Sequence, residues 1–291
     1  MRTILICLCL LLPNALQAQA PAADAARLDR LSNAERLEAL TALLRERGIE
    51  FEVQSFPNER KEKDSREQGQ NLIVTIGSGP RDIVIGAHFD AVRLRDGKLS
   101  HGMVDNAAGA VVLTRVAEGL RARRLKHRVR LVFFDMEEIG LLGSAHYVKS
   151  LDSKVAAAVN VDIAGYGDTL IFGPGKNEGN AEVYGAMWRT CSEQRLACME
   201  FPNFPQGDDR SFQAGKIPNL SLAILPALEA HQLWLMLNGG KESGLTEGFV
   251  PPILQTIHAP GDTAEKLDAA AMTRISDAVV NLVMELDEVF P

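Results

Sequence analysis

Two adjacent carboxylates, Glu137 and Glu138, lie where an apolar run ends and a glycine follows. The pattern predicts a buried strand over residues 131–134 and a helix after Gly140. Acids at the carboxyl end of such a strand face the crevice in which open α/β sheets bind ligands. Two anions in a partly dry cleft repel each other, and a metal dication would remove that repulsion. One carboxylate could then bind the metal while its neighbour takes a proton from the attacking water. An adjacent acid pair more often marks a solvated helix N-terminus, so the metal hypothesis depends on ligands from elsewhere in the chain.

A histidine and an aspartate follow the strand predicted over residues 82–87. The side chains of His88 and Asp90 share a face, because strand residues two apart point the same way. Asp90 can therefore accept the second ring N–H of His88 and set which ring nitrogen faces a metal. The alternative is a core histidine whose hydrogen bonds are satisfied within the protein.

Three further candidate ligands lie at predicted strand ends or helix starts. Asp105 precedes small residues at the start of a predicted helix, where it could cap the helix or bridge two cations. Asp162 follows the apolar strand predicted over residues 155–161. His258 lies in a turn before the last predicted helix, and Asp262 could orient it, cap that helix, or do both.

Together these residues make a donor set of two imidazoles and three carboxylates. If one carboxylate bridges, they form two sites, each with one nitrogen and several oxygen ligands. Nitrogen and oxygen ligands without thiolate suit zinc, with Mn²⁺ or Co²⁺ as substitutes. Two such ions can polarise a carbonyl and activate water together, so the predicted chemistry is hydrolysis.

The segments that carry these residues resemble a known family, the co-catalytic di-zinc aminopeptidases related to secreted bacterial leucyl aminopeptidase and glutamate carboxypeptidase. The resemblance covers roughly residues 82–268, in family order. Its motifs are AHFD (87–90), VDNAAG (104–109), FDMEEIGLLGSAHY (134–147), VNVDIAG (159–165) and IHAPGDT (257–263).

The resemblance implies a role for each candidate. One zinc would be held by His88, Asp105 and Asp162, and the other by Asp105, Glu138 and His258, so that Asp105 bridges. Glu137 would be the general base, and Asp90 would support His88 from behind. A strained, cis peptide after Asp105 is also typical of the family.

The substrate side of the site departs from the family pattern. Relatives often carry Asp-His before a Phe or Trp, whereas this chain has Asp208 and then Asp209 in place of the His. Either acid could hold the α-ammonium group of a peptide. Tyr166 and Trp234 could line a side-chain pocket; the alternative, which we favour, is that they simply pack in the core or at the rim of the site.

The implied function is that of a zinc-dependent aminopeptidase acting on peptides. A carboxypeptidase or a glutaminyl-peptide cyclase on the same scaffold is the alternative. Related cyclases usually lack the first histidine ligand and place a Trp before the last one, whereas here His88 is present and Ile257 precedes His258. A non-catalytic metal-binding relative is a third interpretation, less favoured because a base and all the ligands are present.

Composition and the first residues bear on partners and location. The 291-residue chain has a formal charge of −7 and no long basic run, which argues against nucleic acid as a partner. Residues 1–20 resemble a secretory signal with a small-x-small end. Their apolar core is too short to span a membrane comfortably, and an uncleaved anchor is the alternative. We therefore expect export to a periplasm or the extracellular space, without stable membrane insertion after cleavage. Cys191 and Cys198 would then form a disulfide, the alternative being two reduced thiols.

The elements that must position these residues alternate along the chain. Predicted strands cover residues 51–55, 71–76, 82–87, 129–134, 155–161, 168–172 and 219–225. Predicted helices cover 22–48, 105–120, 139–150, 181–194 and 263–289, the last capped by Asp262 or Thr263. This alternation predicts one catalytic domain over residues 21–291, a three-layer α/β/α fold of the zinc exopeptidase type with a mixed, mostly parallel sheet. Residues 226–252 fit the sheet pattern poorly and are predicted to form an excursion near the site mouth.

Overall fold

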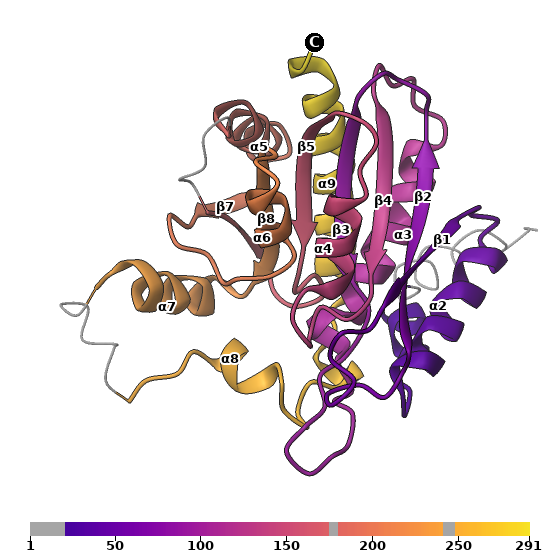
Figure 1. Ribbon diagram of the computed structural model, residues 1–291. Coiled ribbons are helices and arrows are strands. Elements are labelled where there is room, and N and C mark those ends of the chain that lie inside the picture. Colours follow the sequence, from indigo (N-terminus) through magenta and orange to yellow (C-terminus); the bar gives the residue numbers. More distant parts are fainter. Residues whose placement is uncertain (1–20, 175–179, 241–247) are drawn as a thin grey trace, which may run out of the picture.

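A mixed β-sheet forms the centre of the molecule (Figure 1). The computed structural model describes residues 21–174, 180–240 and 248–291, so the predicted signal over residues 1–20 lies outside the described region. Within it, eight strands are ordered β1-β2-β4-β3-β5-β8-β6-β7. They are β1 (Glu52–Pro57), β2 (Gln68–Ile76), β3 (Asp82–His88), β4 (Arg128–Phe134), β5 (Val155–Val161), β6 (Thr169–Gly173), β7 (Ala197–Glu200) and β8 (Asn219–Leu225).

The inner strands of the sheet are parallel, as predicted. The pairs β4–β3, β3–β5 and β5–β8 are parallel, whereas β2 is antiparallel to both β1 and β4, and β6 is antiparallel to β8. Every residue of β3 is buried, which fits its nearly continuous apolar sequence and its position between helical layers.

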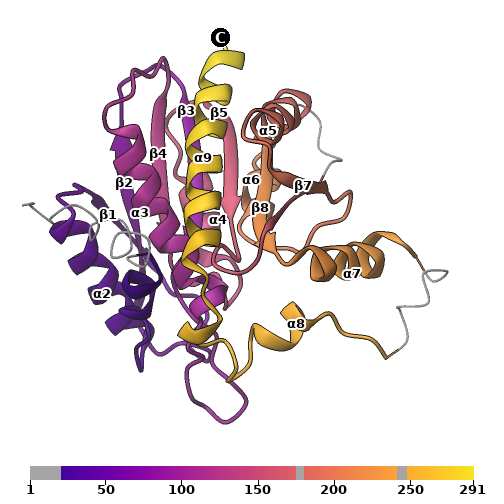
Figure 2. The same ribbon diagram turned by 180° about the vertical axis from the view of Figure 1, so that it is seen from behind.

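Helices cover both faces of this sheet. The described helices are α2 (Asn33–Glu46), α3 (Ala108–Leu120), α4 (Leu142–Lys149), α5 (Ala181–Glu193), α6 (Asp209–Ala214), α7 (Ala227–Asn238), α8 (Pro252–Thr256) and α9 (Ala269–Val289), with short turns η1 (Met103–Ala107) and η3 (Ala264–Lys266). Helices α3, α5 and α9 lie on one face (Figure 2), and α4 and α6 lie on the other. The predicted three-layer α/β/α architecture is confirmed. None of the described helices is both long and apolar enough to cross a membrane.

Amphipathic helices hold the larger core together. In α9, Met272, Ile275, Val279, Leu282 and Leu286 recur at three- and four-residue intervals and are all buried. They pack with the apolar strands and α3 into one cluster. On the opposite face Phe134, Tyr147 and Phe212 form a second cluster beneath α4 and α6.

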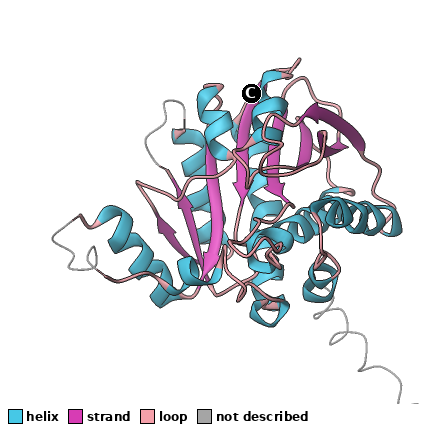
Figure 3. Ribbon diagram, turned by 60° about the horizontal axis from the view of Figure 1, so that its bottom comes forward, coloured by secondary structure: helices cyan, strands magenta, loops and turns pink. Residues whose placement is uncertain are grey.

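The register of the parallel strands fixes where the site lies. His88 pairs with Phe134 across β3 and β4, and Gly86 pairs with Asn160 across β3 and β5. The residues that follow these three strands therefore leave the sheet side by side. We call the carboxyl ends of β3, β4 and β5 the metal-binding edge; Figure 3 turns it towards the viewer.

Several elements differ from the predictions. The helix predicted over residues 22–48 is broken, because Ser32 starts a new helix by accepting the Glu35 N–H at 3.2 Å. The last helix begins at Ala269 and is capped by Asp268, so neither Asp262 nor Thr263 caps it. Strand β7 and helices α6, α7 and α8 were not predicted as elements, although α7 lies in the excursion predicted over residues 226–252.

The predicted disulfide is present. Cys191 in α5 and Cys198 in β7 are bonded, with an S–S distance of 2.08 Å. The bond joins a helix of one layer to an edge strand of the sheet.

Candidate metal centre

Two groups of side chains that could hold a metal ion meet at the metal-binding edge. One group is His88, Asp105 and Asp162, and the other is Asp105, Glu138 and His258. Within each group the ligand atoms all lie within 4.8 Å of one another. The structure thus brings together all five residues that the sequence proposed as ligands.

The two carboxylate oxygens of Asp105 face different imidazoles. Asp105 Oδ1 lies 3.1 Å from His88 Nε2, and Asp105 Oδ2 lies 3.2 Å from His258 Nε2. The outer carboxylates complete the two groups, with Asp162 Oδ1 3.7 Å from His88 Nε2 and Glu138 Oε2 3.0 Å from His258 Nε2. Asp105 is therefore placed to bridge two cations.

Small residues and an amide hold Asp105 in this position. The Asp105–Asn106 peptide is cis, as the family resemblance implied. The Asn106 side chain donates to Val161 O at 2.9 Å and accepts the Gly109 N–H at 3.1 Å. A Cβ on Gly109 would lie only 2.3 Å from Asn106 Oδ1, so this position requires glycine.

Asp90 supports two ligand-bearing segments at once. Its carboxylate lies 3.4 Å from His88 Nδ1, close to the predicted contact, while the nearer partner of that nitrogen is Asp90 O at 3.2 Å. The same carboxylate accepts the N–H groups of Glu137 at 3.1 Å and Glu138 at 3.2 Å. Asp90 therefore ties the end of β3 to the loop after β4.

Asp262 acts on the bridging segment instead of on His258. Its carboxylate accepts the Val104 N–H at 2.6 Å and the Asp105 N–H at 3.1 Å. The prediction that it orients His258 or caps the last helix is replaced by this contact, which orients the backbone of Asp105.

Glu137 belongs to neither ligand group and lies beside both. A Cβ on Gly207 would be 3.8 Å from Glu137 Oε1 and 3.2 Å from Asp162 Oδ2. Any side chain at position 207 would thus enter the space between the proposed base and a proposed ligand. Sequence reasoning missed Gly207, although its place directly before the Asp208-Asp209 pair was a usable signal.

The site crowds several carboxylates together in buried positions, and this raises the pKa values of Glu137 and Glu138. Burial and the nearby Asp105 carboxylate raise the pKa of Glu138 to about 7, in spite of His258. Burial also raises the pKa of Glu137 well above its usual value, with Asp208, Glu138 and Asp162 adding to the effect. Hydrogen bonds to Asp105 and Glu138 raise the pKa of His258 to about 11. Carboxylates crowded in this way favour a bound cation.

The donor chemistry fits zinc. Among the described residues, buried Glu138 Oε1 and Asp162 Oδ1 have no hydrogen-bond partner, so each has a lone pair to offer. Imidazole and carboxylate ligands without thiolate are typical of catalytic zinc sites.

Of the four candidate substrate residues, Asp208 alone has no hydrogen-bond partner for its side chain in the described structure. Asp208 is completely buried, and neither of its carboxylate oxygens makes a hydrogen bond within the described structure. Asp209 is engaged locally, since it accepts the Gly207 N–H at 3.0 Å and an N–H of Gln213. Tyr166 donates to Glu229, and Trp234 donates to Glu200 O at 3.0 Å. Both aromatic rings pack on a small apolar cluster that also contacts Ile163 and Ile257, the neighbours of two proposed ligands.

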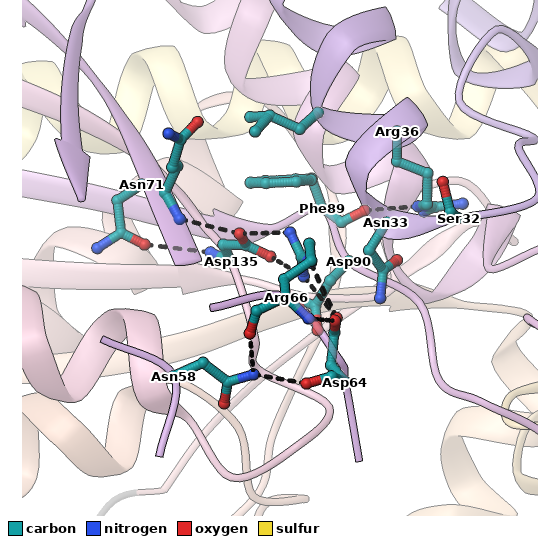
Figure 4. Close-up of polar contacts among 12 residues, drawn as sticks. Ser32, Asn33, Arg36, Asn58, Asp64, Arg66, Asn71, Phe89, Asp90 and Asp135 are labelled. Carbon is teal, nitrogen blue, oxygen red and sulfur yellow. Dashed lines mark hydrogen bonds and ion pairs between the residues drawn. The ribbon is translucent and has the colours of Figure 1, made fainter. Parts of the chain in front are cut away.

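An arginine–aspartate pair missed by sequence reasoning braces the end of β4 (Figure 4). Asp135, two residues before Glu137, is fully buried. It accepts two hydrogen bonds from Arg66, at 2.9 and 3.0 Å, and a third from the Gln70 N–H at 2.9 Å. Arg66 comes from the connection between β1 and β2, where a charged loop carries no local signal of this contact.

The fold and the two side-chain groups define an α/β/α protein with a candidate metal centre at the carboxyl ends of its parallel strands. Residues 71–283 match peptidase family M28, and the chain belongs to this family.

Similarity to individual proteins is partial in length. The chain is 38% identical to leucine aminopeptidase 2 of Trichophyton rubrum over 101 residues, which are 33% of this chain and 19% of the relative. It is 29% identical to aminopeptidase YwaD of Bacillus subtilis over 208 residues, 71% of this chain and 41% of the relative. The chain thus spans less than half the length of these relatives. In fold it resembles the crystal structure of Porphyromonas gingivalis glutaminyl cyclase, with a TM-score of 0.71, 17% identity, and coverage of 94% of this chain and 98% of that one.

Proposed function

We propose that this protein is an exopeptidase that uses two zinc ions and the general base Glu137 to remove N-terminal residues from peptides. The observation that carries the proposal is the placement of Asp105 between two histidines, with Glu137 outside both ligand groups. A carboxylate that is free of ligand duty beside a two-cation site is what hydrolysis by general base catalysis requires.

The ligand groups assign the roles. His88, Asp105 and Asp162 would hold one zinc, and Asp105, Glu138 and His258 the other. When bound, zinc polarises a carbonyl and lowers the pKa of water; Mn²⁺ or Co²⁺ could substitute. Glu137 takes a proton from the attacking water and delivers it to the leaving amine. A C–O bond forms and the C–N bond breaks, which gives a free amino acid and a shortened peptide.

Asp208 is the candidate for recognising the substrate's α-ammonium group. Burial raises its pKa to about 7, and both of its oxygens lack hydrogen-bond partners in the described structure. A cation bound there would be stabilised by the ionised form. Tyr166 and Trp234 are candidates for the rim of the side-chain pocket, while Asp209 serves Gly207 and acts on the substrate indirectly.

The alternatives use the same scaffold. Because the fold resembles that of a glutaminyl cyclase, cyclase activity is one alternative. A carboxypeptidase or a non-catalytic metal-binding protein would also use this centre. The presence of both His88 and a free Glu137 favours peptide hydrolysis.

A substrate panel separates these functions. The purified protein, loaded with zinc, is given free peptides, N-blocked peptides, peptides with N-terminal glutamine, and aminoacyl-anilides. We expect N-terminal residues to be released, release to stop when a chelator removes the metal, and zinc to restore it. Activity that survives complete metal removal, or cleavage of N-blocked peptides at their carboxyl ends, would contradict the proposal.

We also propose that residues 1–20 direct export. The exported protein would then begin at Pro21, which its intact mass tests.

A further inference from the structure

Arg36 lies completely buried beneath the metal-binding edge and bonds only to main-chain carbonyls in the described structure. Its Nε donates to Phe89 O at 2.7 Å (Figure 4). One terminal nitrogen donates to Leu28 O at 3.0 Å and His101 O at 2.7 Å, and the other to Gly102 O at 3.0 Å. The guanidinium thus joins three chain segments.

Two of these segments carry proposed metal ligands. Phe89 stands between His88 and Asp90, and Gly102 begins the short segment that leads to Asp105. Both carbonyl oxygens accept a hydrogen bond from Arg36. Gly102 O also accepts the Ala107 N–H at 3.0 Å, within its own segment, so no main-chain hydrogen bond joins two segments at these carbonyls in the described structure.

Helix α2 holds the first of these segments at a second point. Asn33 donates to Ala91 O at 3.1 Å and accepts the Ala91 N–H at 2.9 Å. Ala91 directly follows Asp90, so the start of α2 holds the turn after β3 through both the N–H and the carbonyl of one residue.

Packing alone does not account for an arginine at position 36. It lies on the buried stripe of α2 with Leu40, Leu43 and Leu44, at helical spacing. Taking a guanidinium out of water costs free energy, and replacing a whole buried ion pair by apolar side chains of similar volume is often neutral or stabilising. A buried cation here is costly for folding, which points to a role in the site.

The charge of Arg36 is balanced by carboxylates that support the metal ligands. Burial lowers the pKa of Arg36 to about 10, while Asp90 and Asp262 oppose that shift, so the group stays charged at neutral pH. Asp90 holds the N–H groups of Glu137 and Glu138, and Asp262 holds the N–H of Asp105.

We propose that Arg36 is a positioning residue for the metal centre, which fixes the turn after β3 against the segment that carries Asp105. Without it, the segment that carries His88 and the segment that carries Asp105 would no longer be held in fixed positions relative to each other. The inference rests on the proposed metal-dependent function, and it concerns a residue that precedes the segment matching family M28.

The variant Arg36→Lys tests this role. Lysine keeps the charge and much of the stem, but its compact ammonium cannot reproduce the planar fork that reaches carbonyls of separate segments. We expect zinc affinity, measured by competition with a chelator, to fall roughly 10- to 100-fold, because supporting residues of metal sites have effects of that size. With saturating zinc, kcat should fall while KM stays near the wild-type value.

Arg47 provides the matched control. It caps the other end of α2 and pairs with Asp24 and, at 3.0 Å, with Glu118. Neither partner belongs to a segment that carries a proposed metal ligand. Both Arg47→Met and Arg36→Lys should lower the thermal unfolding midpoint, but Arg47→Met should leave zinc affinity unchanged.

Each outcome bears on the proposal. Wild-type zinc affinity in Arg36→Lys, or an equal loss in Arg47→Met, would overturn the positioning role. A lysine variant that does not fold even with excess zinc would assign Arg36 to folding alone and overturn it too. Wild-type protein that binds no zinc would instead overturn the proposed function on which this inference rests.

Discussion

Asp105 is the residue on which the proposed two-cation site depends most, because it belongs to both candidate ligand groups. Its two oxygens lie 3.1 and 3.2 Å from the two imidazoles, and its pKa is well below the usual range because His258 and His88 outweigh the effect of burial. A carboxylate that stays ionised in a buried site, and faces two separate ligand groups, is suited to bridging.

Asp209 gives a prediction about pH. Burial raises its pKa to about 6, above the value near 3.9 of an unfolded chain. The folded state therefore holds the proton more tightly, and Asp209 makes the protein less stable as pH rises from about 4 to above 6. Asp209→Asn removes this titration and can still accept the Gly207 N–H. We expect it to stabilise the protein by about 3 kcal/mol at pH 8 and by less than about 1 kcal/mol at pH 4, measured by thermal unfolding.

The difference between variant and wild type isolates this one group, because the other carboxylates titrate in both proteins. A stabilisation that is the same at both pH values, or larger at pH 4, would contradict the assignment.

The elements explain how much could be predicted. The strand ends at His88, Glu137 and Asp162 were predictable because long apolar runs mark buried parallel strands, and their carboxyl ends meet by topology. The contacts of Arg36 with Phe89 and Gly102, and of Arg66 with Asp135, were not, because these partners lie 53 to 69 residues away in sequence. Helix α6 has only six residues, too few for a periodic signal. A buried arginine on the leucine stripe of α2 was the one available sign of the first contact.

The connection between β1 and β2 gives a prediction at this scale. Arg66→Met would leave the Asp135 carboxylate buried, with the Gln70 N–H of β2 as its remaining hydrogen-bond donor in the described structure. Removing one partner of a buried pair costs roughly 3 kcal/mol or more. We expect a loss of that order in the free energy of unfolding at pH 8, where Asp135 is ionised, since burial raises its pKa only to about 6.

Lys61 on the same connection is the control, because its pair with Glu67 is exposed. Lys61→Met should change stability by less than about 1 kcal/mol. Adding Asp135→Asn to Arg66→Met should recover part of the loss, and a double variant as unstable as the sum of both singles would contradict the pairing.

Across the whole molecule, the site is assembled from residues inside the segment that matches family M28 and from residues that precede it. Residues 71–283 match family M28 and supply every proposed ligand and the base. The preceding elements, α2 and the connection between β1 and β2, supply Arg36 and Arg66, which brace the segments from behind. The sheet brings these contributions to one edge, so that the protein forms one three-layer unit around one centre (Figure 3).

The most direct test of this account is the zinc content and turnover of Glu137→Gln. Glutamine is nearly isosteric and lies outside both ligand groups, so the variant should bind two zinc ions per chain, as wild type should. Its kcat on an aminoacyl-anilide should fall by roughly 10²- to 10⁴-fold, the usual contribution of a general base. Turnover equal to that of the wild type, or the loss of zinc together with activity, would contradict the central claim that Glu137 moves the proton and does not hold the metal.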